Sequence, residues 1–280
     1  MSSFRIALAQ IAPRLGDIRG NVESHLKLVD EARGAGVDVL LFPELSLVGN
    51  ALGDLADDLA LDLDASEFGE IRRASREIAI GIGLIERGLD RASRNAYLYL
   101  EGGTVRHVQR KVHLATDDRR GEARVLAAGD RIAAFETRRG RFGILIGDDA
   151  RHLPAAAILA LERVDAIVAP TSVVDRPAAM RSPADAFVAT TGALAELSRC
   201  HLFAVNRTGS EEGEIYAGRS RIVGPDGTIL GAADGAEEGL VHGELDYELL
   251  RSARRSAPGP RDLRRDVILA QMRRIEETGR

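Results

Sequence analysis

The sequence has little cysteine and little aromatic surface. Its 280 residues include one cysteine, Cys200, and no tryptophan, and aromatic residues make up 4% of the chain. A single cysteine excludes an intrachain disulfide. Apolar runs are also short, and none approaches the ~18 residues that a membrane helix needs, so we expect no bilayer span. The first ten residues alternate polar with apolar side chains and lack a basic segment, which predicts a strand rather than a signal peptide, and a cytoplasmic protein.

Positive charge is in deficit as well. The chain has 38 Lys+Arg against 43 Asp+Glu, a net charge of -5. This is the wrong sign for a dedicated nucleic-acid binder, whose affinity depends on neutralising phosphates. Hydrophobic residues make up 45% and charged residues 29%, an ordinary globular composition with enough apolar material for a sizeable core. No linker, repeat or low-complexity segment divides the chain, so we expect a single domain over residues 1–280.

No metal or other cofactor is implied by the sequence. The histidines show neither the H-E-x-x-H nor the H-x-H spacing of a metal site, and there is no cysteine cluster. The glycines at 129 and 224–227 belong to turns, because neither a P-loop nor a dinucleotide-binding fingerprint is present.

Helical and strand patterns alternate along the chain. Period-two alternation or short apolar runs predict strands at 4–8, 38–42, 79–84, 97–100, 105–109, 132–137, 142–146, 166–169, 202–205, 216–223, 228–230 and 240–245. Helical periodicity predicts a first helix capped by Asn21, and further helices at 66–78, 154–163, 183–199 and 267–277. This alternation favours sheets layered with helices outside.

Three loops at strand ends carry polar residues that packing alone does not require. Glu44 follows an apolar strand and Pro43 and has apolar neighbours. Desolvation there would raise the pKa of its carboxyl group, which suits a general base. The alternative is a solvated loop glutamate. Lys111 follows another strand and could stabilise an oxyanion. Gly147, Asp148 and Asp149 follow a third, where an ordinary turn with an aspartate cap is the alternative.

Taken together, these segments resemble the carbon–nitrogen hydrolase (nitrilase) superfamily. Phe-Pro-Glu at 42–44, Arg-Lys-Val-His-Leu at 110–114, Gly-Glu at 121–122, Gly-Arg-Ser at 218–220, Pro-Asp-Gly at 225–227 and Arg-Asp-Leu-Arg at 261–264 are similar to its motifs in order and spacing. The stretch 6–50 is most similar to the glutaminase domain of glutamine-dependent NAD synthetases. No segment resembles their synthetase half, which leaves open an ATP-dependent partner acting in trans.

The resemblance implies a four-layer α-β-β-α sandwich and a catalytic Glu–Lys–Cys triad. It assigns Glu44 to the general base, Lys111 to the triad lysine and Glu122 to a second active-site glutamate. The nucleophilic cysteine should follow the strand at 142–146, but Gly147 stands there, followed by Asp148 and the retained Asp149. Gly147, Asp148 and Asp149 are therefore expected to line a ligand site rather than to form a covalent intermediate.

Two hypotheses follow from this loss. The first is a non-hydrolytic protein that binds a small molecule, such as an amide or carboxylate, or a partner, through the vacated pocket. The second is an active amidase that uses water activated by Glu44, or Asp148 as nucleophile. Cys200 cannot replace the missing residue, because it lies at a helix–strand junction where we expect it to be buried and unreactive. His201 points to the opposite face of the strand and cannot activate it.

The resemblance also implies assembly. Family members usually pair two sandwiches, and the helix at 183–199 falls where their interface helices lie. Its apolar residues Phe187, Val188, Leu194 and Leu197 exceed what one face needs for its own core. We therefore expect a homodimer or a higher even oligomer.

Overall fold

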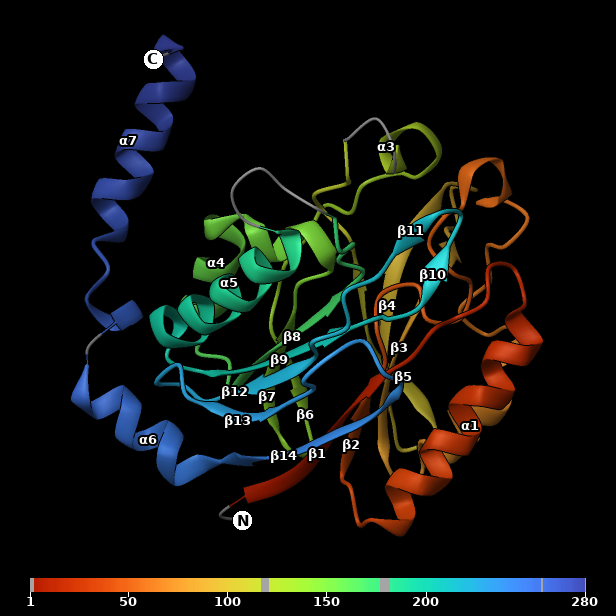
Figure 1. Ribbon diagram of the computed structural model, residues 1–280. Coiled ribbons are helices and arrows are strands. Elements are labelled where there is room, and N and C mark those ends of the chain that lie inside the picture. The colour runs from red at the N-terminus through yellow and green to blue at the C-terminus, as the bar shows by residue number, and fades with distance from the viewer. Residues whose placement is uncertain (1–2, 117–120, 177–181, 258, 280) are drawn as a thin grey trace.

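The structure is a computed structural model that describes residues 3–116, 121–176, 182–257 and 259–279. Two six-stranded sheets face each other, and helices cover their outer faces (Figure 1). The predicted α-β-β-α sandwich is therefore confirmed. In the described part of the chain, no helix combines the length and the apolar character needed to cross a membrane.

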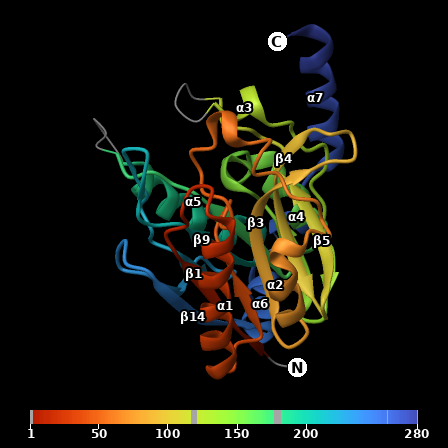
Figure 2. The same ribbon diagram turned by 90° about the vertical axis from the view of Figure 1, so that its right-hand side faces the viewer.

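The first sheet has the strand order β14-β1-β2-β3-β4-β5. Strand β1 pairs in parallel with β2, which pairs in parallel with β3, and the remaining neighbours are antiparallel. The bounds are β1 Ser3–Gln10, β2 Val39–Leu41, β3 Ala79–Arg87, β4 Ser93–Glu101, β5 Thr104–Arg110 and β14 Gly239–Asp246. Helices α1 (Ile18–Gly34) and α2 (Gly69–Ala74) lie on its outer face (Figure 2).

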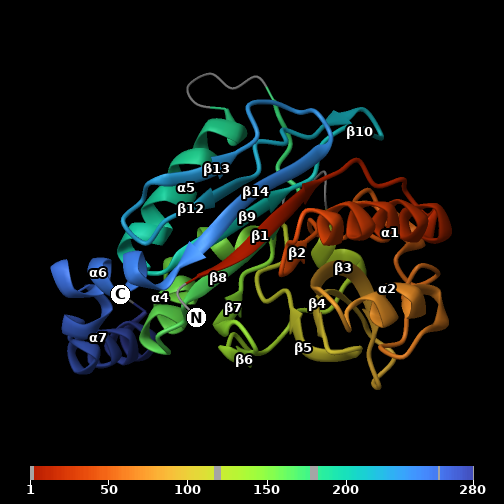
Figure 3. The ribbon, with the colours of Figure 1, turned by 90° about the horizontal axis from the view of Figure 1, so that it is seen from below.

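The second sheet has the order β13-β12-β9-β8-β7-β6, with β7, β8 and β9 parallel. The bounds are β6 Phe135–Thr137, β7 Gly140–Ile144, β8 Ala166–Thr171, β9 His201–Asn206, β12 Arg221–Val223 and β13 Ile229–Ala232. Helices α4 (Leu153–Leu161) and α5 (Pro183–Ser198) cover its outer face (Figure 3). A short hairpin, β10 Ser210–Glu211 and β11 Glu214–Ile215, lies beside the sheets.

Three clusters of buried side chains correspond to the three interfaces between the four layers. Alternate residues of β1 show how one strand serves two of them: Ala7 and Ala9 pack toward the outer helices, whereas Ile6 and Leu8 pack between the sheets. Phe142 of the opposite sheet belongs to the same central cluster. The third cluster lies between the second sheet and helices α4 and α5.

The remaining helical elements are short or lie outside the sandwich. They are the 3-10 turns η1 Gly53–Leu55, η2 Ser66–Phe68, η3 Gly147–Arg151 and η4 Gly259–Asp262, and the helices α3 Glu122–Val125, α6 Tyr247–Ser256 and α7 Arg265–Thr278. Helix α7 projects away from the sandwich (Figure 1).

The predicted cap of the first helix is wrong. Helix α1 begins at Ile18, and the side chain of Asp17 accepts the capping hydrogen bond from the Gly20 N–H. Asn21 is instead buried inside the helix, where its amide donates to the Leu47 carbonyl at 2.9 Å. Both residue types favour N-cap positions, and this tertiary hydrogen bond decides between them.

Three other boundaries also differ from the sequence patterns. The helix expected at 66–78 is a 3-10 turn followed by the short α2, which ends at Ala74. The strand expected at 132–137 begins at Phe135, and the one expected at 216–223 is regular only from Arg221.

Candidate active site

Glu44 is held where the chain leaves β2. The Tyr97 hydroxyl donates to the Phe42 carbonyl at 2.7 Å, and Leu45 adopts a left-handed backbone with φ +52°. Gly83 of the adjacent β3 allows this loop to pass, because a Cβ there would lie 2.3 Å from the Leu45 nitrogen. The glutamate is consequently fixed with only 3% of its surface exposed.

Lys111 follows β5 and is 1% exposed. Its ammonium lies 2.9 Å from Glu44 Oε1 and 2.7 Å from Glu122 Oε2. Glu122 begins the short helix α3 and also accepts a hydrogen bond from the Ala115 N–H at 2.8 Å. The structure thus brings together the three residues that the sequence resemblance assigns to catalysis. We call Glu44, Lys111 and Glu122 the charged cluster.

Asn95 joins the two glutamates from the middle of the first sheet. Its Nδ2 donates to Glu44 Oε1 at 2.9 Å and to Glu122 Oε1 at 3.0 Å. No sequence pattern considered above pointed to this residue. The signal that could have found it is a polar side chain directly before the apolar run 96–100 of strand β4.

Burial and charge oppose each other in the charged cluster. Burial raises the pKa of Glu44, the Lys111 charge lowers it, and the charges of Glu122 and Asp148 raise it further, with a net upward shift. Burial alone would lower the pKa of Lys111, but the two glutamates outweigh burial and raise it. Lys111 is therefore a permanent cation, and Glu44 is the group able to exchange a proton.

Asp149 fixes the loop that carries Lys111. Its carboxylate is fully buried and accepts hydrogen bonds from the N–H groups of Val112 and His113, at 3.2 Å and 2.7 Å. It also lies 2.8 Å from His113 Nδ1 and accepts from the Ile146 N–H. Asp149 was expected to bind substrate, but this geometry gives it a positioning role behind the site.

Gly147 faces the charged cluster from the second sheet. It opens η3 with a left-handed backbone, φ +52°. A Cβ built there would lie 2.8 Å from Glu44 Oε1 and 2.9 Å from both Glu44 Oε2 and Lys111 Nζ. Any side chain at this position would touch the glutamate and the lysine at once.

The carbon-nitrogen hydrolase family model matches residues 5–255, which is most of the chain. The chain belongs to this family. It is 31% identical over 260 residues to "Hydrolase in pqqF 5'region" of Pseudomonas protegens, covering 91% of this chain and 87% of that protein.

Other relatives of the family are longer than this chain. A glutamine-dependent NAD(+) synthetase of Acinetobacter baylyi is 26% identical over 251 residues, which cover 90% of this chain and 46% of the synthetase. The chain thus spans about half the length of such relatives. Among solved structures, an amidase from Nesterenkonia sp., bearing an acetamide moiety on its active-site cysteine, superimposes with a TM-score of 0.79 at 20% identity. The match covers 96% of this chain and 97% of that one.

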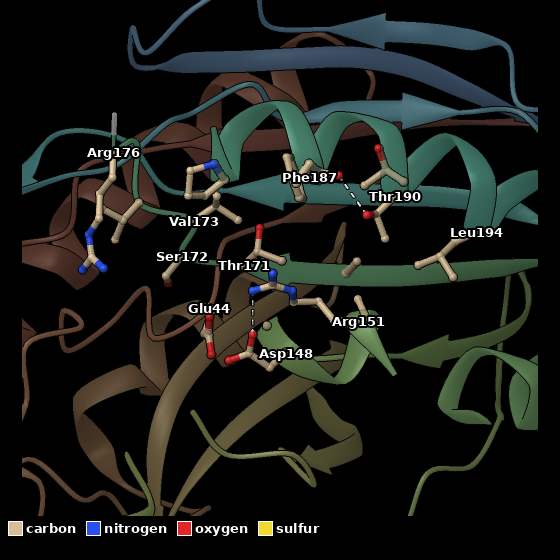
Figure 4. A pocket seen from close by; sticks show the side chains of 17 residues that line it. Glu44, Asp148, Arg151, Thr171, Ser172, Val173, Arg176, Phe187, Thr190 and Leu194 are labelled. Carbon is tan, nitrogen blue, oxygen red and sulfur yellow. Dashed lines mark hydrogen bonds and ion pairs between the residues drawn. The ribbon is translucent and has the colours of Figure 1, made fainter. Parts of the chain in front are cut away.

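A cavity of about 340 Å³ opens beside the position where this carbon–nitrogen hydrolase chain has Gly147. Glu44, Gly147 and Asp148 line one side, and Arg151 and Ser172 also border it (Figure 4). The volume is at the lower end of the range for small-molecule pockets. Lys111, Glu122 and Asp149 are not among its lining residues, so Glu44 is the member of the charged cluster that a ligand would meet.

Ser172 is a second residue of the site to which no sequence pattern pointed. It follows strand β8, is 4% exposed, and its Oγ makes no hydrogen bond within the described chain. Figure 4 shows its side chain above Glu44. A buried hydroxyl without a partner is costly in free energy unless something else satisfies it. A polar ligand atom in the cavity would do so.

Cys200 lies away from this cavity. It is fully buried between α5 and β9, and burial raises the pKa of its thiol to about 12. Its predicted burial is confirmed. A thiol with this pKa carries almost no thiolate at neutral pH, so Cys200 cannot serve the site as a nucleophile.

Proposed function

We propose that this protein binds a small molecule bearing an amide or carboxylate group in the cavity beside Glu44, and does not hydrolyse it. The observation that carries the proposal is the contact geometry of Gly147. This residue stands where the family resemblance expects the nucleophilic cysteine, and a Cβ there would touch Glu44 and Lys111. The position is therefore the right one for attack on a bound amide, but it has no atom that can attack.

The absence of a nucleophile at position 147 should lower any hydrolytic rate severely. Removing the nucleophile of a catalytic triad lowers kcat by about 10⁶, leaving a rate of roughly 10³ over water from the rest of the site. The charged cluster does not argue against this proposal, because its retention has a structural reason. Lys111 neutralises two buried carboxylates, and its loss would leave both of them without a cation.

The walls of the cavity suit a polar ligand. Glu44 Oε2 faces the Gly147 position and accepts no hydrogen bond from the described chain, so it can take an amide N–H. The Ser172 hydroxyl can donate or accept. Arg151 borders the same space. Among the described residues its one ion pair is a long contact of 3.4 Å with Asp148, which leaves donors for a ligand carboxylate or carbonyl.

Amide hydrolysis without cysteine is the second candidate function. The raised pKa of Glu44 is the observation that favours it, because a carboxylate tuned upward is a better general base toward water. Asp148 also lines the cavity and could attack directly. An acyl-aspartate would be an anhydride among several carboxylates, which makes this route the less favourable of the two.

One experiment separates these functions. Wild type, Glu44→Ala, Asp148→Asn and Gly147→Cys are incubated with glutamine, acetamide and p-nitrophenyl acetate, and ammonia release and intact mass are recorded. We expect wild type to release ammonia no faster than Glu44→Ala and to gain no acyl mass. Gly147→Cys should gain one acyl group, because Lys111 would lower the pKa of the new thiol. Wild type also contains Cys200 and therefore controls for acylation of that thiol.

Other outcomes overturn the proposal in distinct ways. Wild-type ammonia release that disappears in Glu44→Ala would establish hydrolysis by activated water. Release that disappears only in Asp148→Asn would establish the aspartate route.

Binding is tested directly by titrating glutamine and acetamide into wild type and Ser172→Ala in a calorimeter. Heat from neither ligand in wild type would contradict an amide-binding cavity.

A further inference from the structure

The cavity beside Gly147 has two walls of different character. One end carries the carboxylates of Glu44 and Asp148, which Figure 4 shows next to each other; we call this the acidic end. The wall across the cavity is one face of helix α5. A ligand that fills the cavity must satisfy both, so the two walls together specify its chemistry.

Negative charge exceeds positive charge at the acidic end. Lys111 is the cation of the charged cluster, and it already contacts the carboxylates of Glu44 and Glu122. Asp148 adds a third carboxylate, whose charge acts on Glu44 and helps to raise its pKa. Because Glu44 is buried, water and salt screen this repulsion little. A cation placed between Glu44 and Asp148 would relieve it.

The two arginines known to border the cavity do not cancel this excess. Arg176 forms a two-pronged ion pair with Glu214, at 2.9 Å and 2.6 Å, so its charge is already matched. Arg151 lies 3.4 Å from Asp148, but its side chain is 67% exposed. An exposed ion pair of this length contributes little to stability. A ligand cation can therefore take the place of Arg151 beside Asp148 at small cost.

The acidic end also offers hydrogen-bond acceptors. Ser172 Oγ is buried and has no hydrogen-bond partner within the described chain. Glu44 Oε2 accepts no hydrogen bond from the same residues, because Asn95 and Lys111 both donate to Oε1. A head group with N–H donors on two nitrogens would satisfy both oxygens. A carboxylate head group has no proton to donate to either.

Helix α5 presents an apolar face to the cavity. The hydroxyls of Thr190 and Thr191 donate to backbone carbonyls of the helix itself, at 2.8 Å and 2.9 Å, so they have no proton left for a ligand. Phe187 and Leu194, which the sequence pattern offered to a second copy, are 9% and 3% exposed and line this cavity. This wall favours an apolar ligand body. The lining residues of α5 recur at helical spacing: Pro183, Ala186, Phe187, Thr190, Thr191 and Leu194.

We propose that the cavity selects a small organic cation, with an amidinium or similar N–H-bearing head group between Glu44 and Asp148 and an apolar body against α5. This inference rests on the proposed function and narrows it, because it takes the same cavity and treats the neutral amide as the weaker analogue of the cation. An amidinium has the planar shape of an amide, but it carries a positive charge and N–H donors on both nitrogens. It can therefore face two carboxylates at once.

Three ligands that share one ring and differ in the head group test this selection. Benzamidine is a cation, benzamide is neutral and benzoate is an anion, and each is titrated into the full-length wild type in a calorimeter. Benzamidine should bind at least about tenfold more tightly than benzamide, the factor that one charge-assisted hydrogen bond supplies. Benzoate should give no heat. Acetamidine keeps the cationic head group without the ring and should bind more weakly than benzamidine, because it leaves the apolar face of α5 uncovered.

Single substitutions assign the effect to the acidic end. Asp148→Asn should weaken benzamidine binding by about tenfold and leave benzamide binding nearly unchanged, which also shows that the variant is folded. Arg151→Gln should strengthen benzamidine binding, because it removes the competing cation. Asp30→Asn is the matched control. Asp30 likewise pairs with an arginine three positions on, Arg33, but it lies on the outer helix α1, so its loss should change neither affinity.

The results separate this inference from the proposed function. Benzamide that binds as tightly as benzamidine would overturn the selection of cations and leave amide binding intact. So would a loss of benzamidine affinity in Asp148→Asn that is no larger than in Asp30→Asn. Benzoate that binds most tightly would overturn it as well, in favour of a carboxylate held by Arg151. Absence of heat from all four ligands would contradict both the inference and the proposed binding cavity.

Discussion

The two sheets contribute to the site in opposite ways. The first supplies Glu44, Asn95 and Lys111, which are buried and hydrogen-bonded to one another or to Glu122. The second supplies Gly147, which has no side chain, and Asp148 at the border of the cavity. The first sheet thus contributes side chains held by several hydrogen bonds each, whereas the second contributes a position without a side chain beside the cavity.

This difference shows which residues of the site are needed for folding and which one would be needed for catalysis. Lys111 compensates two buried carboxylates, so its loss disturbs folding whether or not any reaction occurs. The nucleophile position has no such constraint, because a glycine there leaves no charge unpaired. Intact acid and base residues are therefore weak indicators of activity in this chain, and the residue at 147 is the informative one.

Replacing Lys111 should produce the largest loss of stability. Lys111→Met keeps a similar apolar stem but leaves Glu44 and Glu122 without their cation, and we expect a loss of about 3–5 kcal/mol in the free energy of unfolding. Urea denaturation measures it. Arg19→Met breaks the exposed ion pair with Glu23 and should lose less than about 1 kcal/mol. Equal effects of the two substitutions would show that the cluster is not a structural unit.

Much of this arrangement could be predicted from the sequence. The order of strands and helices follows from apolar periodicity, whereas the four-layer sandwich and the places of Glu44, Lys111 and Glu122 follow from the resemblance of short motifs to those of the family. Such signals are local, because a strand's alternation and a motif's residues lie close together in the chain. The burial of Cys200 was predictable for the same reason, since the residue lies between an amphipathic helix and an apolar strand.

The missed features depend on contacts between distant segments. Asn95 reaches the two glutamates only because β4 lies between β3 and β5. Gly83 is required because the loop after β2 passes over β3. Asp17 caps α1 because Asn21 is held by Leu47, 26 residues away. No pattern within one segment contains this information.

Glu44→Gln should change how stability depends on pH. The pKa of Glu44 is raised in the folded protein, so between the unfolded value near 4.3 and the folded value the native state holds a proton that the unfolded state has lost. Wild-type stability therefore falls with rising pH in this window, by up to about 1.4 kcal/mol per pH unit from this group. Glutamine cannot titrate and removes that slope.

The measurement is the free energy of unfolding of both proteins at intervals from pH 4.5 to 8. The difference, Glu44→Gln minus wild type, should increase with pH and level off above the folded pKa. Glu23→Gln, which removes an exposed carboxylate, controls for the loss of one charge. A difference that stays constant or decreases with pH would mean that Lys111, and not burial, dominates the pKa of Glu44.

The difference in stability between Gly147→Ala and Gly53→Ala should be the smallest of these effects, and it tests whether the site has room for a side chain at position 147. Gly147 and Gly53 both begin 3-10 turns with similar left-handed backbones, φ +52° and +46°. A Cβ at Gly53 meets nothing within 4 Å, whereas one at Gly147 meets the ends of Glu44 and Lys111 below 3 Å. The left-handed backbone alone costs alanine about 1–2 kcal/mol at either position, so the difference between the two substitutions isolates the contact.

Because the contacted atoms end long side chains, which can move by a few tenths of an ångström, the loss of stability in Gly147→Ala should exceed that in Gly53→Ala by no more than about 1 kcal/mol in urea denaturation. That result would mean that the charged cluster still leaves room for a side chain at 147, as acylation of Gly147→Cys requires. A much larger excess would mean that Glu44 and Lys111 have closed over the position, and that the first sheet has adapted to the loss on the second.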